Sequence, residues 1–250
     1  MATHRHLANA PITEAVIDFS FEPRPDRNFS QLEQAYKELD FGYRQLGSLL
    51  AGFFQFQASD TSVAVQQSPE GSQRIGLRLQ SDNDKYVALV RLNGMSVSRL
   101  PPYETFEALE QEMRRLWAIY INRWGPAKIK RVACRFINNL KLPLKHSESF
   151  GTYIHTLIEI PPDLPQNIGS FFQQFVIQDQ ESRGTVRLSL GWDGQGAPQS
   201  IPVILDLDAF TLGDFDVSEE SAWSVLGVLR KLKNRCFFGT LTEECVKLYE

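Results

Sequence analysis

The chain has 250 residues, of which 42% are hydrophobic and 22% are charged, with 26 Lys and Arg residues set against 30 Asp and Glu residues. This composition is typical of a globular protein, and a chain of this length can bury a full hydrophobic core. The net charge of −4 argues against a protein that mainly wraps nucleic acid or lies on an acidic membrane. No apolar run approaches the roughly 18 residues of a membrane-spanning helix. The first residues also lack the apolar stretch of a secretory signal, so we expect a cytoplasmic protein.

Cysteine and histidine are too few and too scattered to predict a metal site. Cys134, Cys236 and Cys245 show no CxxC spacing, and His146 and His155 lie outside HxH and HxxxH spacing. The chain also lacks the phosphate-binding glycine loops, the nucleophile elbow and the HExxH helix of common enzyme families. We therefore expect reduced cysteines, no metal and no cofactor.

The first half of the chain predicts one antiparallel sheet with helices. Alternation over Ile12–Phe21 predicts a half-buried strand, and Asn28 then caps a short helix. After a less regular stretch, alternating residues from Phe53 to Leu100 predict an antiparallel meander. Within it, Asn93-Gly94 predicts a type I′ hairpin turn, in which both residues take positive φ. Apolar residues at helical spacing predict a long helix over Tyr103–Asn122.

Gly125-Pro126 separates this half from a second series of elements. A long strand over Ile129–Leu142 opens the series, and a short helix or loop follows around Ser147–Ile158. Asp216, with Glu219 three residues later, predicts a variant capping box at the start of a last long helix. The remaining strands are predicted at Ser170–Gln178, Arg183–Leu190 and Ile201–Phe210.

Both halves follow the order strand, helix, antiparallel strands, long helix. A duplication, with halves at residues 1–125 and 126–250 joined in one compact unit, is therefore a hypothesis. The order predicts an α+β fold, a curved antiparallel sheet with the long helices on one face. A helix-grip fold and a TATA-binding-protein-like saddle both have this shape.

Arginine pairs four residues apart occur on three predicted strands. Because side chains alternate along a strand, residues i and i+4 lie on the same face, about 13 Å apart. Acidic residues on two other predicted strands are expected to lie opposite them: Glu14, Asp18 and Glu22 on the first strand, and Asp206 with Asp208 on the last. The arginine pairs are Arg74 and Arg78, Arg131 and Arg135, and Arg183 and Arg187.

This sheet face admits three interpretations. As cross-strand ion pairs on a solvated surface, the charges stabilise the sheet by about 0.2–1 kcal/mol each. As a recognition surface, the arginines bind carboxylate, phosphate or nucleic-acid backbone, which match the planar guanidinium. As a subunit interface, the same face makes the protein a homo-oligomer.

A basic segment gives a second, weaker indication of a nucleic-acid partner. Between Met113 and Glu148 there are nine Lys and Arg residues and no Asp or Glu. Basic residues interleaved with Trp117, Tyr120 and Trp124 are typical of single-strand binding. The competing interpretation places these aromatic residues in the core, because the first two lie on the apolar stripe of the long helix.

Five short strings occur in a characteristic order along almost the whole chain. They are LANAPITEA (Leu7–Ala15), PPY (Pro101–Tyr103), LWAIY (Leu116–Tyr120), RVACRFINNL (Arg131–Leu140) and FGTLTE (Phe238–Glu243). Together they resemble a prokaryotic family of similar length that is distributed sporadically among bacteria and archaea and has no established function. The resemblance implies a complete single-unit protein in a mobile-gene or defence-type setting. It carries no catalytic residue.

These patterns favour a non-enzymatic cytoplasmic binding protein, in a defence or toxin–antitoxin setting, whose arginine-bearing face binds a protein or an anionic ligand. The first alternative is an enzyme acting on a phosphate-bearing or other anionic substrate, with Asp206 and Asp208 as acid and base or as cation ligands. The second alternative is a nucleic-acid-binding protein. We expect no membrane partner.

Overall fold

The computed structural model describes most of the chain. Within residues 51–72 it describes the backbone of the strands but not the side chains. The described residues are 2–22, 24–37, 40–51, 54–59, 62–67, 73–125, 128–144, 149–155, 160–161, 163–196, 200–217 and 220–250. Nine strands form one antiparallel sheet in the order β2-β5-β6-β7-β1-β8-β11-β10-β9. The sheet is open, so β2 and β9 are its edges. The expected α+β class with an antiparallel sheet is confirmed.

The strands of this sheet are β1 (Ile12–Ser20), β2 (Tyr43–Ala51), β5 (Gln73–Ser81), β6 (Tyr86–Arg91), β7 (Gly94–Arg99), β8 (Lys128–Leu142), β9 (Phe171–Asp179), β10 (Gly184–Trp192) and β11 (Ile201–Asp216). Two further strands, β3 (Phe54–Ser59) and β4 (Ser62–Gln67), pair only with each other. The helices are α1 (Phe29–Lys37), α2 (Phe106–Trp124), the single 3₁₀ turn η1 (Phe150–Thr152), α3 (Ser221–Thr240) and α4 (Glu243–Lys247).

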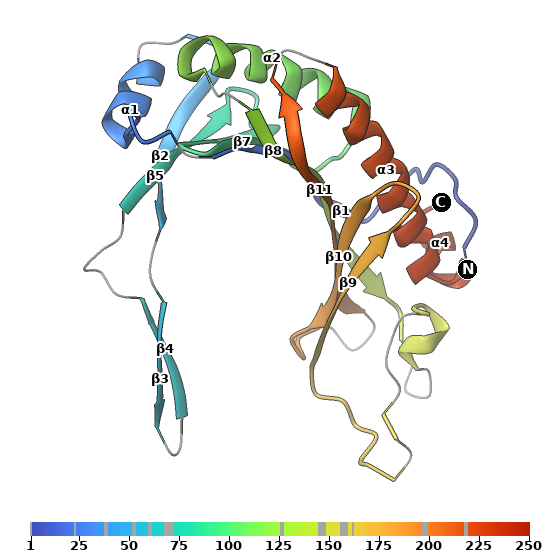
Figure 1. Ribbon diagram of the computed structural model, residues 1–250. Coiled ribbons are helices and arrows are strands. Elements are labelled where there is room, and N and C mark those ends of the chain that lie inside the picture. Colours follow the sequence, from blue (N-terminus) through green and yellow to red (C-terminus); the bar gives the residue numbers. More distant parts are fainter. Residues whose placement is uncertain are drawn as a thin grey trace.

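The long helices cover one side of the curved sheet, as expected, and leave the concave side open (Figure 1). Helix α2 packs on β7 and β1, and α3 packs on β11, β8 and β10. Local signals define α2: the Thr105 hydroxyl accepts a hydrogen bond from the amide of Ala108, and Gly125 ends the helix at φ 59°. None of the described helices is long and apolar enough to cross a bilayer.

Phe19 lies where the two long helices meet the middle of the sheet. Its side chain is fully buried on β1. Its ring centroid is 5.2 Å from that of Trp117 on α2 and 4.9 Å from that of Trp223 on α3, both edge to face. This arrangement adds a directional aromatic contribution to the apolar area that the rings bury. The residue therefore links both helices to the central strand.

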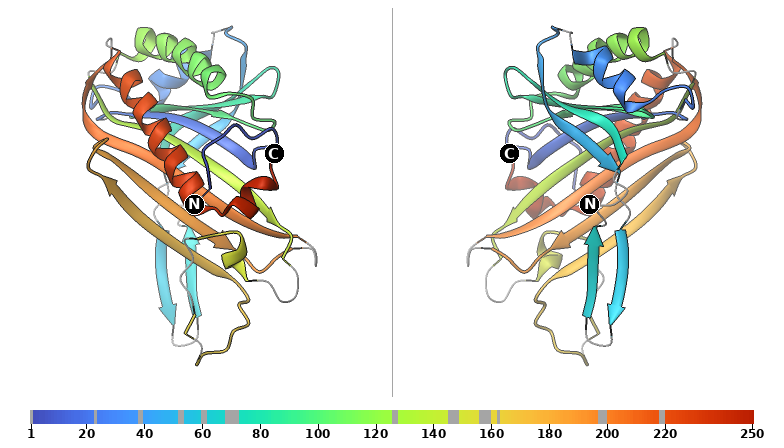
Figure 2. Two further views of the ribbon diagram at one scale, coloured as in Figure 1. Left: turned by 90° about the vertical axis from the view of Figure 1, so that its right-hand side faces the viewer. Right: turned by 90° about the vertical axis from the view of Figure 1, so that its left-hand side faces the viewer.

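The predicted meander differs from the structure in its N-terminal part. Strand β2 was not predicted, because two register shifts against β5, at Gln45/Gly47 and Leu49/Leu50, break the two-residue alternation. Strands β3 and β4 do form, but as a separate hairpin that extends beyond the main sheet (Figure 2). The meander proper consists of β5, β6 and β7.

Two local predictions also need correction. The β6–β7 turn consists of Leu92 and Asn93, neither of which has positive φ, so it is not the predicted type I′ turn. Gly94 is needed there for space, since a Cβ atom would lie 2.6 Å from the carbonyl oxygen of Phe19.

Asp216 caps no helix. It continues β11 opposite Lys128, past an irregularity in the strand pairing, and Glu219 lies outside the described residues.

Candidate functional site on the open sheet face

The open face is the side of the nine-stranded sheet that the helices leave uncovered. Alternation places Asp18 of β1, Arg131 and Arg135 of β8, and Asp206 and Asp208 of β11 on this face. Residues between them, such as those of the buried β8 stripe, point toward the helices. The acidic and basic side chains therefore share one surface on neighbouring strands.

Arg131 lies at the centre of an ion-pair network on this face. Its Nη2 donates to both carboxylate oxygens of Asp208, at 2.8 and 2.9 Å, and its Nη1 donates to Asp18 at 3.1 Å. The guanidinium carbon also lies 4.8 Å from the ring centroid of Phe210. Only 11% of the Asp208 side chain and 16% of that of Asp18 are exposed. Arg131 thus bridges two partly buried carboxylates, of which Asp18 also accepts a hydrogen bond from Arg91 of β6.

Arg135 and Arg187 lie nearer to solvent. Arg135 holds Asp206 through two hydrogen bonds, Nε–Oδ1 at 2.9 Å and Nη2–Oδ2 at 2.6 Å, which raise the pKa of its guanidinium. Arg187 approaches Asp208 at 3.6 Å, a looser contact. Both arginine side chains are 49% exposed. Their guanidinium groups are therefore accessible to a partner without disruption of the core.

The other predicted arginines do not join this cluster. Arg78 is exposed on the open face of β5, four strands and about 19 Å from β8. Arg74 lies against α1, with its guanidinium carbon 5.7 Å from the Phe29 ring centroid. Arg183 lies in the β9–β10 turn with φ 53°, before β10 begins, so the predicted same-face pair with Arg187 is wrong. Strand alternation does not apply across a turn.

A groove of about 990 Å³ runs along the outer end of the open face, over β9, β10 and β11. Arg135, Arg187 and Asp206 form its polar wall, and Phe172 and Ile204 contribute apolar surface. Phe172 is 72% exposed. We call this region the outer groove. It combines two accessible cations, each close to a carboxylate, with exposed apolar side chains.

The two aspartates are not arranged as an acid–base pair or as a cation site. Asp206 is bonded to Arg135, and Asp208 is bonded to Arg131. Each carboxylate therefore has its charge balanced by a guanidinium, which occupies the oxygens that a cation would need. Among the described residues, no group of three or more His, Cys, Asp and Glu side chains could hold a metal ion.

Several residues of the basic segment pair with acids from elsewhere on the same helix or from distant parts of the chain. Arg114 bonds to Glu110 and Glu220, and its guanidinium carbon lies 4.1 Å from the Trp223 ring centroid. Lys130 pairs with Glu22 at 3.4 Å. The aromatic residues of the segment are core residues, with at most 3% exposure at Trp117, Tyr120 and Trp124. These contacts favour the core interpretation of the aromatic residues.

A chemically unusual residue on the helix side was not predicted. Lys233 of α3 is buried next to a pocket, and burial lowers the pKa of its ammonium to about 8. A signal was available in the sequence: Leu226, Leu229, Lys233 and Phe237 follow helical spacing, so the lysine interrupts an apolar stripe. A charged residue at a stripe position is expected to be buried.

Comparison with known proteins does not identify a family for this chain. A scan against protein-family models and a search of the curated proteins both find no match.

Proposed function

We propose that the chain is a non-enzymatic cytoplasmic binding protein whose outer groove binds a segment of a partner protein, in a defence or toxin–antitoxin setting. The observation that carries the proposal is the groove itself, where exposed apolar side chains lie beside Arg135 and Arg187. Because Asp206 pairs with Arg135, and Asp208, already bonded to Arg131, lies 3.6 Å from Arg187, the surface presents both signs of charge. It therefore suits a protein segment with apolar and mixed-charge side chains better than a polyanion.

The fold supports a saddle of two related halves, residues 1–125 and 126–250, and we propose this relationship as well. The first strands of the two halves, β1 and β8, pair with each other at the centre. In each half, the strand before the long helix, β7 or β11, pairs with the other edge of that first strand. This order favours a TATA-binding-protein-like saddle over a helix-grip fold. The second half has no described counterpart of β2, and η1 stands where α1 does in the first.

In the test, the full chain is used as the bait to select peptides from a displayed random-peptide library. The affinity of each selected peptide is then measured for the wild-type protein and for two variants. Phe172→Ser combined with Arg187→Ser is expected to weaken binding at least about tenfold, because an aromatic contact and a charge contact are both lost. Val228→Ser is the control, since Val228 is an exposed apolar residue on α3, on the other side of the sheet. Equal affinity for wild type and the double variant would contradict the proposal. The proposal would also be contradicted if light scattering showed that the selected peptides bind the protein only as self-associated aggregates.

Two further measurements test the alternatives. Titration with Mg²⁺ or Mn²⁺ is expected to leave the Tm unchanged, because arginines already hold Asp206 and Asp208. A rise in Tm that Asp206→Asn removes would support a cation site and an enzyme. Binding of a fluorescent single-stranded DNA that weakens steeply with salt would support a nucleic-acid-binding protein instead.

A further inference from the structure

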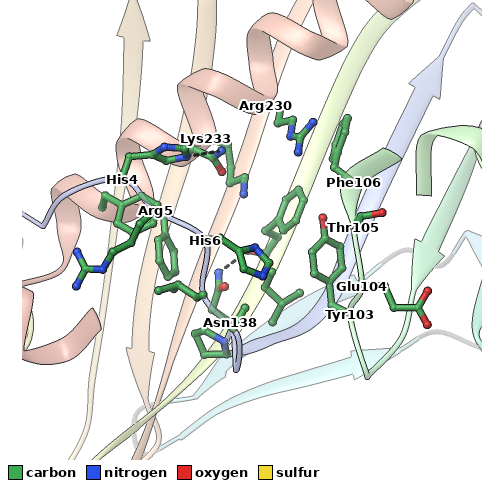
Figure 3. Close-up of a pocket in the computed structure, with 18 of the residues that line it drawn as sticks. His4, Arg5, His6, Tyr103, Glu104, Thr105, Phe106, Asn138, Arg230 and Lys233 are labelled. Carbon is green, nitrogen blue, oxygen red and sulfur yellow. Dashed lines mark hydrogen bonds between the residues drawn. The ribbon is translucent and has the colours of Figure 1, made fainter. Parts of the chain in front are cut away.

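A second cavity, on the helix side of the sheet, has the features of a small-molecule site. Its volume is about 420 Å³, within the range of ligand pockets. It lies between the N-terminal segment, the start of α2 and the second half of α3 (Figure 3). Five aromatic side chains line it: Tyr103, Phe106, Phe136, Phe237 and Phe238.

Lys233 brings a cation to the aromatic side chains that line this cavity. The residue is only 8% exposed, and its Nζ lies 3.6 Å from the ring centroid of Phe136. In the part of the chain that the structure describes, no carboxylate lies within 4.0 Å of this ammonium, and no hydrogen-bond acceptor is assigned to it. Removal from water disfavours the charged form and lowers the pKa to about 8, so the amine is still mostly protonated at neutral pH.

The neighbouring charges leave this ammonium uncompensated. Arg230, one turn earlier on α3, is paired with Glu107 of α2. Glu104 is bonded to Lys85 and Arg99, so neither acid is available to Lys233. The other polar groups around the cavity are His4, Arg5, His6, Thr105, Asn138 and Asn234. Arg5 is turned to Glu243 and Glu250, and the side-chain amide of Asn138 donates to the carbonyls of Phe136 and Leu205.

We propose that this cavity binds a small monocarboxylate with an aromatic body, whose carboxylate pairs with the Lys233 ammonium and whose body packs among the surrounding rings. One uncompensated positive charge matches one negative charge, which favours a monoanion over a phosphate dianion. The aromatic walls favour a flat apolar body, because ring–ring contacts add to apolar burial. Pairing with the carboxylate also offsets the desolvation of the buried cation. The site lies on the opposite side of the sheet from the outer groove and does not depend on it.

The first test uses the unaltered full chain with sodium benzoate, benzamide and inorganic phosphate as probes. Binding of each probe is measured by calorimetry and by the shift in Tm. Benzoate is expected to bind and to raise the Tm, whereas benzamide, which has nearly the same shape without the charge, binds at least about tenfold more weakly. Equal binding of benzoate and benzamide would overturn the role of charge. Binding of phosphate but not benzoate would overturn the aromatic-carboxylate class, and binding of none of the three would overturn the site.

The second test assigns the charge to Lys233. Lys233→Met keeps an unbranched apolar side chain in the core and is expected to fold and to lose benzoate binding by at least about tenfold. Lys231→Met is the matched control, because Lys231 is an exposed residue on the same helix, and this variant is expected to bind benzoate as wild type does. A folded Lys233→Met protein that binds benzoate with unchanged affinity would overturn the proposal. If that variant does not fold, the comparison of benzoate with benzamide on the unaltered chain decides.

Discussion

Replacing Phe19 by alanine is expected to lower the free energy of unfolding by about 3–5 kcal/mol. The ring is fully buried and packs edge to face on Trp117 of α2 and Trp223 of α3. Its removal leaves a cavity beneath both helices, which a rigid sheet cannot close. Chemical denaturation, followed by circular dichroism and by tryptophan fluorescence, measures the change.

The matched control for this variant is Phe172→Ala. That phenylalanine is 72% exposed on the edge strand β9, so its loss is expected to change stability by less than about 1 kcal/mol. If residues 1–125 and 126–250 form one compact unit, the two spectroscopic probes report a single transition in every variant. Separate transitions for the two probes would contradict a single compact unit. A decrease of less than about 1 kcal/mol in the free energy of unfolding of Phe19→Ala would contradict the role of Phe19 in linking both helices to β1.

Replacing Arg131 by methionine is expected to destabilise the fold by about 2–3 kcal/mol. Among the described residues, Asp208 would lose both of its hydrogen bonds from Arg131 and keep only Arg187 at 3.6 Å. Asp18 would lose one hydrogen bond and keep the one from Arg91. The same change at Arg135 is the comparison, because Arg135 lies four residues along the same strand but is half exposed. We expect it to cost less than about 1 kcal/mol.

A double variant separates the lost ion pair from lost packing. In Arg131→Met with Asp208→Asn, the buried negative charge is gone, so part of the stability is expected to return relative to Arg131→Met alone. Equal destabilisation by Arg131→Met and Arg135→Met would show that the network is no more than a surface feature. The distinction matters for function: binding experiments should alter Arg135 and Arg187, because a change at Arg131 affects the fold as well.

Regular local patterns in the sequence predicted much of the fold. The Asn28 cap is confirmed by its side-chain oxygen, which accepts from the amide of Gln31 at 3.1 Å. The long strand β8 and the long helix α2 also match their predictions closely, because their periodicities are uninterrupted. β2 could not be predicted, since its register shifts depend on the partner strand. The length of β11 likewise depends on pairing with the start of β8.

The candidate site shows the same division between local and distant information. Alternation correctly placed Arg131, Arg135, Asp206 and Asp208 on one face, because it depends only on the strand itself. It could not show which carboxylate each guanidinium meets, since strand register and sheet twist determine those pairs. Arg183 failed for a simpler reason: a one-residue error in the strand boundary placed a turn residue in a strand.

The central position of β1 has a consequence for how the chain folds. Its two neighbours are β7, at residues 94–99, and β8, at residues 128–142, so it gains its second partner only after more than half of the chain has been synthesised. Such distant pairings slow folding and leave a strand edge unpaired in the meantime. Glu14 places a carboxylate on that strand, a feature that opposes pairing with other chains, whereas Asp18 is paired with Arg91 of β6. When β8 arrives, Arg131 meets the carboxylate of Asp18. The carboxylate of Asp18 thus connects three strands, because Arg91 of β6 and Arg131 of β8 both donate to it from either side of β1.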